Sequence, residues 1–565
     1  MYTITFRAEG GTTTKVSSAA GENILHAAIQ AEAVIDAPCS GNGTCGKCLV
    51  RLISGTVDSA HNIHLSDYDF NDGWRLACQC TVSGDATLLI PESAAAFKTG
   101  IRTADLSSKE ELEKYTDSLS AIFSCGISPG VQQSGIGLAI DIGTTTVTGA
   151  LIDLESGSIL SKASAGNGQI RYGADVINRI IHSSREGGSE KLRRAITDDT
   201  LVPLINSMCE LGGISGSDIN RAVVAGNTTM EHLFMGIDAE SIRLEPYVPV
   251  FLELHGQTGA ETKLPIASDA PVIFAPNVGS YVGGDISAGV LTTMLWSKSD
   301  LTLFIDLGTN GELVLGNEDF MLCCACSAGP AFEGGDISCG MRATNGAIES
   351  CVIDADTMEP VLEVVGENEK PAGLCGSGII DTISELFRCG IIDSRGKFAR
   401  DGSRIIRGEY EASYVLSFAS DSATGKNVEI TEIDIDNFIR AKGAIFSAIR
   451  AMLNVLDMDI DMIDRVLVAG GIGSGINIRS AIGIGMLPAI DENKYEYIGN
   501  SSLTGACAML ISQEAEEKVY ELGRNMTYLE LSSHPGYMDE FVAACFLPHT
   551  DAGLFEQGGV YGDNQ

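Results

Sequence analysis

The segment GLAIDIGTTTVTGALID, residues 137–153, passes from one apolar stretch through a short polar turn into a second apolar stretch. The first stretch ends at Asp141, and Gly143, Thr144 and Thr145 form the turn. Backbone N–H groups and threonine hydroxyls in such a turn can hold phosphate oxygens, and the aspartate can hold Mg²⁺ through water. The segment predicts a β-hairpin that binds a phosphate group, although many tight hairpins without a ligand also carry Asp-x-Gly.

A second segment, LFIDLGTNGELVL at residues 303–315, repeats this pattern. Here the strand ends at Asp306, and the turn contains Gly308, Thr309 and Asn310. The same physical reasoning predicts a second phosphate-binding turn and a second carboxylate near Mg²⁺. Because a strand–Asp–x–Gly–Thr turn occurs twice, the fold is expected to be loosely duplicated.

A third segment, RVLVAGGIGSGIN at residues 465–477, takes a strand into a glycine-rich turn at Gly470 and Gly471. Glycine lets the backbone come close to an adenine and a ribose. The sequence contains no Walker A motif, and no Rossmann fingerprint follows an early strand, so neither of these nucleotide-binding classes is expected.

In this order, the three segments resemble the phosphate-1, phosphate-2 and adenosine motifs of the actin, sugar-kinase and chaperone ATPase superfamily. Apolar residues between Phe438 and Leu456 fit the helix that precedes the third motif. The resemblance implies a two-lobed, ribonuclease H-like α/β fold that binds ATP between its lobes. It also implies that Asp141 and Asp306 organise Mg-ATP and are the catalytic residues.

Four cysteines near the N-terminus form a second chemical motif. Cys39, Cys45 and Cys48 have the spacing C-x5-C-x2-C, and Cys78 follows later in the chain. Three thiolates at this spacing can surround one small cluster from a single loop, whose glycines let backbone N–H groups donate to sulfur. A zinc site is the alternative, but zinc ribbons usually supply a second close cysteine pair. The pattern favours an iron–sulfur cluster.

The cysteine spacing is one residue longer than the plant-type C-x4-C-x2-C and resembles the adrenodoxin-like variant of [2Fe-2S] ferredoxins. The letters RLACQ around Cys78 resemble the fourth-ligand segment of that family. The resemblance implies that Cys39, Cys45, Cys48 and Cys78 hold a [2Fe-2S] cluster, and that Cys80 is not a ligand.

The remaining N-terminal sequence fits such a domain. Its alternating and amphipathic patterns predict strands on either side of a single helix, which suggests a β-grasp sheet. The expected elements are strands at 2–7 and 12–17, a helix at 23–29, and strands at 48–53 and 86–91.

Changes in composition divide the chain into four parts. A polar stretch of small residues, ending in Ser128-Pro129-Gly130, is interpreted as a linker that carries a short helix of its own. Strands, helices and glycine-rich turns then alternate in an α/β manner. The expected parts are a ferredoxin-like domain at 1–94, the linker at 95–134, a first ATPase-like lobe at 135–298 and a second lobe at 299–565.

Composition and charge exclude several classes of function. The chain has 565 residues, 44% of them hydrophobic, and no run approaches the roughly 20 apolar residues that a membrane helix needs. A net charge of −38 disfavours binding to nucleic acids and to anionic membranes. Sixteen cysteines and an N-terminus without a secretory signal indicate a reducing compartment, so we expect a cytoplasmic protein.

The combination of a ferredoxin-like module with this type of ATPase narrows the possible functions. With both parts, the chain resembles the reductive activators of corrinoid proteins. The similarity runs nearly from end to end. Further segments that carry it are GNTTMEH at 226–232, SAGPAFEG at 327–334, CGSGIID at 375–381 and the stretch at 541–550.

This resemblance implies an enzyme that reduces the Co(II) of a corrinoid methyltransferase protein to Co(I) with one electron while it hydrolyses ATP. ATP is needed because Co(II)/Co(I) lies below an ordinary ferredoxin potential, and each ~59 mV of deficit is a tenfold penalty for one electron. The implied partners are the corrinoid protein, a low-potential donor such as ferredoxin or flavodoxin, and a second copy of the chain in a homodimer.

Two details concern individual residues. Ser327 is the candidate for contact with the corrinoid, and a tight turn near phosphate is the alternative interpretation of its loop. Some activators carry further C-terminal cysteine motifs for [4Fe-4S] clusters, whereas this C-terminus has only Cys545, so a single cluster is expected. Cys323, Cys324 and Cys326 are interpreted as part of a buried strand.

Three other functions remain open at this point. An activator of a radical dehydratase shares the ATPase fold, but that class bridges a [4Fe-4S] cluster between subunits and has no ferredoxin module. A sugar or acyl kinase would need a base for its acceptor and would have no use for a cluster. A nucleotide-binding redox sensor or electron-transfer protein would not turn over ATP in response to a corrinoid protein.

Overall fold

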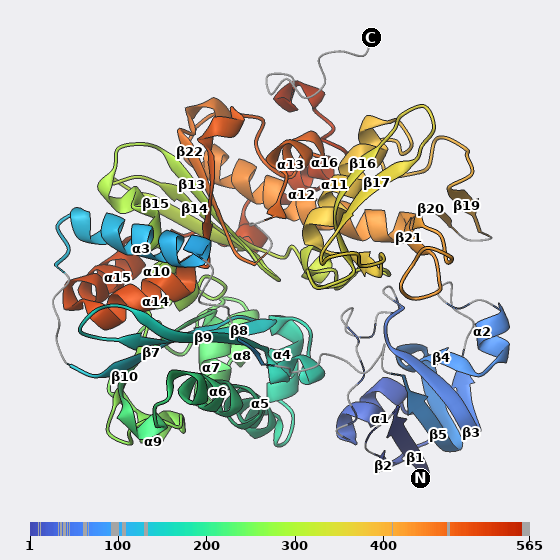
Figure 1. Cartoon of the computed structure of the whole chain (residues 1–565), viewed down its shortest axis with the longest axis horizontal. Coiled ribbons are helices and arrows are strands. Elements are labelled where there is room, and N and C mark those ends of the chain that lie inside the picture. Colours follow the sequence, from blue (N-terminus) through green and yellow to red (C-terminus); the bar gives the residue numbers. More distant parts are fainter. Residues whose placement is uncertain are drawn as a thin grey trace.

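The computed structural model describes residues 1–9, 11, 13–31, 33, 35, 37, 41, 43, 46–59, 65, 67–91, 101–103, 109–128, 134–408, 411–471 and 475–555. Figure 1 shows a small N-terminal domain beside a larger α/β body with two main sheets. This architecture confirms the predicted fold class. Among the described helices, none is long and apolar enough to cross a membrane.

The N-terminal domain is a five-stranded sheet with a helix packed on it, as the sequence pattern predicts. Its elements are β1 (Tyr2–Ala8), β2 (Thr13–Ser18), α1 (Ile24–Gln30), β3 (Leu49–Ser59), α2 (Asp67–Asn71), β4 (Trp74–Leu76) and β5 (Cys80–Ile90). The strand order is β2-β1-β5-β3-β4, with β1 and β5 parallel. The Asn23 side chain caps α1 and donates a 2.7 Å hydrogen bond to the carbonyl of Cys78, so the helix cap also holds the Cys78 segment.

The middle of the chain forms a seven-stranded sheet in the order β11-β12-β10-β7-β8-β9-β6. Its strands are β6 (Arg102–Thr103), β7 (Ile136–Ile142), β8 (Thr146–Asp153), β9 (Ile159–Gly166), β10 (Ile219–Gly226), β11 (Gln257–Thr258) and β12 (Pro271–Phe274). The helices of this region are α3 (Lys109–Ser124), α4 (Val176–Ser183), α5 (Gly188–Ile196), α6 (Val202–Gly212), α7 (Thr228–Met235), α8 (Glu240–Arg243), α9 (Gly259–Thr262) and α10 (Gly284–Thr293). Helix α3 is the helix expected within the linker, and β6 of the same stretch pairs with β9.

The C-terminal region forms a six-stranded sheet in the order β23-β22-β13-β14-β15-β24. Its strands are β13 (Thr302–Leu307), β14 (Gly311–Gly316), β15 (Met321–Cys326), β22 (Arg465–Ala469), β23 (Tyr495–Gly499) and β24 (Thr527–Tyr528). Strand β13 pairs antiparallel with β14 and parallel with β22, so the second and third nucleotide motifs are neighbours. Cys323, Cys324 and Cys326 are buried in β15, which confirms the interpretation of this segment as a strand.

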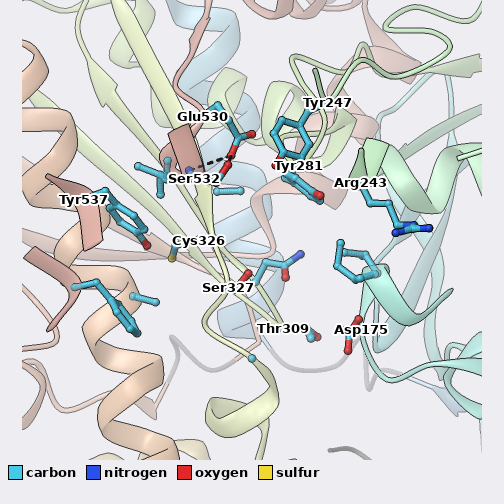
Figure 2. A pocket seen from close by; sticks show the side chains of 18 of the residues that line it. Asp175, Arg243, Tyr247, Tyr281, Thr309, Cys326, Ser327, Glu530, Ser532 and Tyr537 are labelled. Atoms are coloured by element: carbon cyan, nitrogen blue, oxygen red, sulfur yellow. Dashed lines mark hydrogen bonds between the residues drawn. The ribbon is translucent and has the colours of Figure 1, made fainter. Parts of the chain in front are cut away.

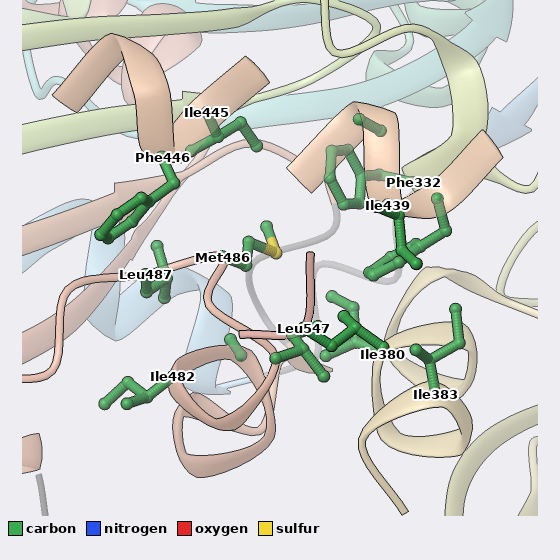
Figure 3. Packing of buried hydrophobic residues seen from close by; sticks show 14 of the residues in the cluster. Phe332, Ile380, Ile383, Ile439, Ile445, Phe446, Ile482, Met486, Leu487 and Leu547 are labelled. Carbon is green, nitrogen blue, oxygen red and sulfur yellow. The ribbon is translucent and has the colours of Figure 1, made fainter. Parts of the chain in front are cut away.

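Two small sheets and several helices complete the C-terminal region. They comprise β16 (Ala347–Ile353), β17 (Pro360–Val364), β18 (Gly373–Leu374), α11 (Gly376–Arg388), β19 (Ile405–Arg407), β20 (Ala412–Ser417), β21 (Val428–Thr431), α12 (Glu432–Val455), α13 (Ile478–Gly483), α14 (Ser501–Ile511), α15 (Gln513–Asn525) and α16 (Tyr537–Ala544). Figure 3 shows one core in which side chains of α11, α12 and α13 meet those of the C-terminal segment, among them Ile380, Ile439, Ile482 and Leu547.

The two main sheets share a hydrophobic core through α10 and α14. These helices cross very closely. A Cβ atom at Gly505 would lie only 2.0 Å from the carbonyl oxygen of Ala288. Residue 505 must therefore be glycine for the two helices to pack in this way. The predicted boundaries of the linker and the two lobes stay a prediction.

Candidate functional site

The two predicted phosphate-binding turns lie face to face. Thr145 Oγ1 and Thr309 Oγ1 are 2.7 Å apart and form a hydrogen bond, although 164 residues separate them in the chain. Each turn is a tight hairpin, closed by Gly143 N to the carbonyl of Thr146 and by Gly308 N to the carbonyl of Asn310, both at 3.0 Å. The duplicated motif thus brings one turn from each main sheet to a common point.

Two side chains that the sequence did not indicate hold the first turn in place. Arg179 of α4 is completely buried, and its guanidinium donates 2.6 Å and 2.8 Å hydrogen bonds to the carbonyls of Thr144 and Gly173. Asn167 donates a 2.9 Å hydrogen bond to the carbonyl of Gly143. Because these carbonyls are tied down, the N–H groups and hydroxyls of the turn are left for a ligand.

The third turn touches the second aspartate. Gly470 has a φ of +95°, and a Cβ atom there would lie 2.8 Å from Asp306 Oδ1 and 2.3 Å from the carbonyl oxygen of Leu307. Only glycine allows this approach. The neighbouring Gly471 is exposed, with no atom within 4 Å of the position its Cβ would take, so this turn presents open backbone beside Asp306.

Four carboxyl groups from four different elements influence one another at this point. Asp141 at the end of β7 and Asp306 at the end of β13 are joined by Asp285 of α10 and Glu312 of β14. Asn500 Nδ2 and Ser502 Oγ donate to Asp141 at 2.9 Å and 3.0 Å. The three aspartates are half-buried, so one side of the group stays open to a ligand.

Burial and mutual repulsion favour the protonated forms of these carboxyls. Burial raises the pKa of Asp285 to about 8, and the charges of Asp141 and Asp306 add to that shift. Burial and the charge of Asp141 raise the pKa of Asp306 to about 7. The pKa of Glu312 is raised well above its usual value by burial and by the charges of Asp285 and Asp306. Burial also raises the pKa of Asp141, although its two hydrogen bonds oppose the shift.

No three of the described His, Cys, Asp and Glu side chains are placed to ligate one metal ion directly, so a divalent cation would be held here by one or two of these carboxyl groups and by water. Carboxylate oxygens are the ligands that Mg²⁺ takes in proteins. Among the causes of the four pKa shifts there is no basic side chain from the described part of the chain, so the negative charge lacks a counter-ion. A bound Mg²⁺ would supply that charge next to the phosphate turns.

We expect Mg²⁺ to stabilise the nucleotide-free protein more at pH 8 than at pH 6. A carboxyl whose folded pKa is raised holds a proton that the unfolded chain releases near pH 4, so folding stability falls as the pH rises through about 7–8. Mg²⁺ binds to the ionised carboxylates and competes with protons for them, so it binds better at the higher pH. Thermal unfolding at both pH values should show a midpoint gain at pH 8 larger by about 1 °C, corresponding to roughly 1 kcal/mol for a chain of 565 residues. Equal gains at both pH values would contradict this prediction.

The structure describes two of the four predicted cluster ligands, Cys48 and Cys78. Cys48 and Cys78 are buried, and their Sγ atoms lie 3.3 Å apart. Two sulfurs bound to one tetrahedral metal at about 2.3 Å lie roughly 3.7 Å apart, so this pair would have to move apart slightly to bind a metal. Cys39 and Cys45 lie outside the described residues.

The described glycines of the cysteine loop pack closely on the Cys78 segment. Gly41 and Gly43 both have positive φ, and Cβ atoms there would lie 3.7 Å from Cys78 Cβ and 2.5 Å from Gln79 Nε2. Burial raises the pKa of Cys80 to about 12, because the thiolate form is disfavoured away from water.

A cavity of about 840 Å³ adjoins the nucleotide turns (Figure 2). The second phosphate turn contributes Thr309 and Asn310 to its lining, and the loop after β15 contributes the exposed Ser327. The structure thus brings Ser327 and the second phosphate turn to the same cavity. Arg243, Tyr247 and Tyr281 line it from the middle region, and Glu530, Ser532 and Tyr537 line it from the C-terminal region.

Three parts of the chain match known protein families. Residues 8–83 match the 2Fe-2S iron-sulfur cluster binding domain, residues 136–298 match the RACo middle region, and residues 300–558 match the C-terminal domain of RACo, the ASKHA domain. Fold and site together define an ASKHA-type ATPase that carries a [2Fe-2S] ferredoxin-like domain. The predicted cofactors, a [2Fe-2S] cluster and ATP, are confirmed by these matches.

Individual relatives make the assignment more specific. The corrinoid activation enzyme RamQ of Eubacterium limosum is 34% identical over 72% of this chain and 69% of its own length. The [Co(II) methylated amine-specific corrinoid protein] reductase of Methanosarcina barkeri is 23% identical over 69% of this chain and 73% of its own. A solved structure of a reductive activator for corrinoid, iron-sulfur protein is 39% identical, covers 98% of this chain and 100% of its own, and has a TM-score of 0.70. The chain belongs to the RACo family of reductive activators of corrinoid proteins.

Proposed function

We propose that this enzyme couples ATP hydrolysis to the one-electron reduction of Co(II) to Co(I) in a corrinoid protein of methyl-transfer metabolism. One observation carries the proposal. A single chain places a buried pair of cysteine sulfurs in a ferredoxin-like domain and a Mg²⁺-compatible carboxylate group at two facing phosphate turns. Neither a kinase nor a simple ferredoxin needs both sites.

Each predicted residue has a part in this proposal. Asp141 and Asp306 hold the Mg²⁺ of Mg-ATP through water, and the neighbouring carboxyls of Asp285 and Glu312 add negative charge that favours the cation. The phosphates bind to the two facing turns, and the nucleoside binds against the glycine turn. The turn residues are Gly143, Thr144, Thr145, Gly308, Thr309 and Asn310, with Gly470 and Gly471 for the nucleoside. The cluster, held by Cys39, Cys45, Cys48 and Cys78, supplies one-electron transfer.

The proposal also covers the electron donor, the oligomeric state and the cellular compartment. We assign a low-potential ferredoxin or flavodoxin as donor, a homodimer as the assembly and the cytoplasm as the location. No disulfide joins two of the described cysteines, which fits a reducing compartment. The net charge of −38 argues against nucleic acids and anionic membranes as partners.

Ser327 is assigned to contact with the corrinoid, because its side chain is exposed in the cavity next to the nucleotide turns. A cavity of about 840 Å³ lies within the range of pockets that take large organic ligands. Since Thr309 and Asn310 line the same cavity, nucleotide binding at that turn can change the affinity for the partner.

An apolar stripe at the cavity rim is assigned to docking of the corrinoid protein. The segment 244–252 exposes Leu244 at 47%, Val248 at 58% and Val250 at 61% of their surfaces. Exposed apolar residues that adjoin one another mark interaction sites more often than free surface. Tyr247 of this segment and the preceding Arg243 line the cavity, so a protein that inserts its corrinoid there would cover the stripe.

Replacing both Val248 and Val250 by aspartate should weaken binding of the corrinoid protein about tenfold or more, because two charges would have to be desolvated at the contact. Titration calorimetry with the Co(II) corrinoid protein measures this, and ATP binding should stay unchanged. Val361→Asp, at a site that is 71% exposed on β17, is the matched control. Unchanged binding together with a loss of dimer in sedimentation would assign the stripe to self-association instead.

The central experiment mixes the anaerobically purified enzyme with a Co(II) corrinoid protein, Mg-ATP and a chemical reductant. We expect the visible spectrum to change to that of Co(I) only when ATP is present. Co(I) formation that is independent of ATP, or none with several unrelated corrinoid proteins despite an intact cluster, would overturn the proposed function.

A further inference from the structure

Lys47 joins the cysteine loop to a loop of the C-terminal region that is distant in sequence. It lies directly before Cys48, and its Nζ donates hydrogen bonds to the carbonyl oxygens of Gly334 at 2.6 Å and Gly340 at 3.0 Å. These acceptors are 287 and 293 residues away in sequence. Figure 1 shows the N-terminal domain next to the C-terminal region where this contact is made.

The receiving loop, residues 334–340, is shaped to present both carbonyls to one donor. Gly334 has a φ of +75°, and a Cβ atom at Gly340 would lie 2.3 Å from the carbonyl oxygen of Gly334. The two glycines therefore close the loop on itself, with their carbonyl oxygens near one another. An ammonium group has three donors and no acceptor, so it suits a site made of carbonyls.

Helix α12 fixes this loop from the other side. Ser338 donates to Asp434 through its backbone N at 2.7 Å and its Oγ at 2.6 Å. Asn437 donates a 2.9 Å hydrogen bond from its side chain to the carbonyl of Asp336. The carbonyls that accept Lys47 thus belong to a braced segment and need little ordering when the N-terminal domain arrives.

The same loop forms part of the wall of the 840 Å³ cavity. Asp336, which lies between the two acceptor glycines, lines the cavity together with Gly329 and Ser327. Since Cys48 is the residue after Lys47, its Cα lies about 3.8 Å from that of Lys47. The contact therefore brings a predicted cluster ligand to the cavity wall.

We propose that Lys47 is a positioning residue that docks the cysteine loop on residues 334–340, so that electrons leave the N-terminal domain at the cavity where the corrinoid is reduced. This inference rests on the proposed function. The step moves one electron, which the N-terminal domain loses and the partner's Co(II) gains to become Co(I). No proton moves and no bond is made between the two proteins. A low-potential one-electron reductant then restores the domain.

The first test measures docking without any corrinoid protein. Hydrogen exchange of the backbone amides in 334–340 is compared between the wild-type chain, Lys47→Met and Lys15→Met. Lys15 is an exposed lysine of β2 and serves as the matched control. Exchange should become about tenfold faster or more in Lys47→Met only, because two hydrogen bonds to a charged donor are lost. Unchanged exchange in Lys47→Met would overturn the proposal.

The second test measures the electron transfer itself. The pre-reduced chain is mixed with a Co(II) corrinoid protein and Mg-ATP, and the first turnover is followed by the Co(I) spectrum. Lys47→Met should slow this step at least about tenfold, and Lys47→Arg, which keeps the charge and the donors, should recover part of the rate. Iron content and the midpoint potential of the cluster should equal those of the wild type, which separates positioning from damage to the cluster.

The outcomes separate this inference from the proposed function. Faster exchange together with a normal first turnover overturns the role of the docked position in electron transfer. A wild-type chain that forms no Co(I) overturns the proposed function, and the exchange result then stands alone as evidence on the docking contact.

Discussion

Cys78→Ser is expected to lose the [2Fe-2S] cluster and to lower ATP-dependent Co(I) formation by more than ~100-fold. The Cys78 sulfur lies 3.3 Å from that of Cys48 in a buried position, so a serine oxygen would remove one of two adjacent ligands. Iron analysis, the visible spectrum of the cluster and the Co(I) assay measure the effect. Nucleotide binding should be unchanged, because the carboxyl groups lie in the other domain.

Cys80→Ser is the matched control for this prediction. Cys80 is a buried cysteine two residues further on, and burial raises the pKa of its thiol to about 12. Serine at this position keeps a small uncharged group and should retain the cluster and most of the activity. If Cys80→Ser lost the iron while Cys78→Ser kept it, the assignment of the fourth ligand would be reversed.

Local sequence patterns are enough to predict much of the N-terminal domain. Alternation at residues 2–7 and 12–17 predicts strands that the structure places at Tyr2–Ala8 and Thr13–Ser18. The strand expected at 86–91 is in fact the end of β5, which begins at Cys80. Pairing continues past Gly84 and Asp85 because Gly55 of β3, with a φ of +90°, packs directly on the carbonyl of Asp85. That contact depends on a distant strand and leaves no local signal.

In the candidate site, too, some residues could be predicted from local sequence and others could not. Asp141 and Asp306 stand in motifs whose spacing carries chemical meaning, so the sequence could indicate them. Asp285 and Glu312 carry only the weak signal of an acidic residue beside glycine, and the strand order and the α10–α14 crossing bring them to the other two carboxyls. Lys47 belongs to the cysteine motif, but its acceptors lie almost 300 residues away, and no local pattern points to them.

The strand pairing also indicates a link between the nucleotide site and the corrinoid contact proposed at Ser327. Strands β14 and β15 pair so that Gly311 lies opposite Cys326 and Glu312 lies opposite Ala325. Ser327 directly follows the paired residues of β15. Glu312 and the cavity loop therefore lie at the same open end of the β14–β15 hairpin. A shift of β14 on Mg-ATP binding would be passed to Ser327 through backbone hydrogen bonds, which gives ATP a route to alter partner affinity.

Asp306→Asn should lower ATP hydrolysis by about 100-fold or more, because the variant lacks a carboxylate that holds the metal beside the transferring phosphate. The same change should raise thermal stability at pH 8 in the absence of nucleotide and Mg²⁺. Burial and the charge of Asp141 raise the pKa of Asp306 to about 7, so ionisation at pH 8 destabilises the wild type. At pH 5, where the folded protein still holds the proton that the unfolded chain has released, the difference in unfolding temperature between the two proteins should be smaller than at pH 8.

Asp319→Asn provides the comparison, since Asp319 is exposed in the turn between β14 and β15 of the same sheet. It should leave both ATP hydrolysis and the pH dependence of stability unchanged. Adding Mg²⁺ at pH 8 should make the wild type more stable than Asp306→Asn, because the wild type binds the cation and the variant binds it only weakly. An Asp306→Asn protein that is inactive yet less stable than the wild type at pH 8 would show that Asp306 supports the fold itself, and would contradict a site held ready for a cation.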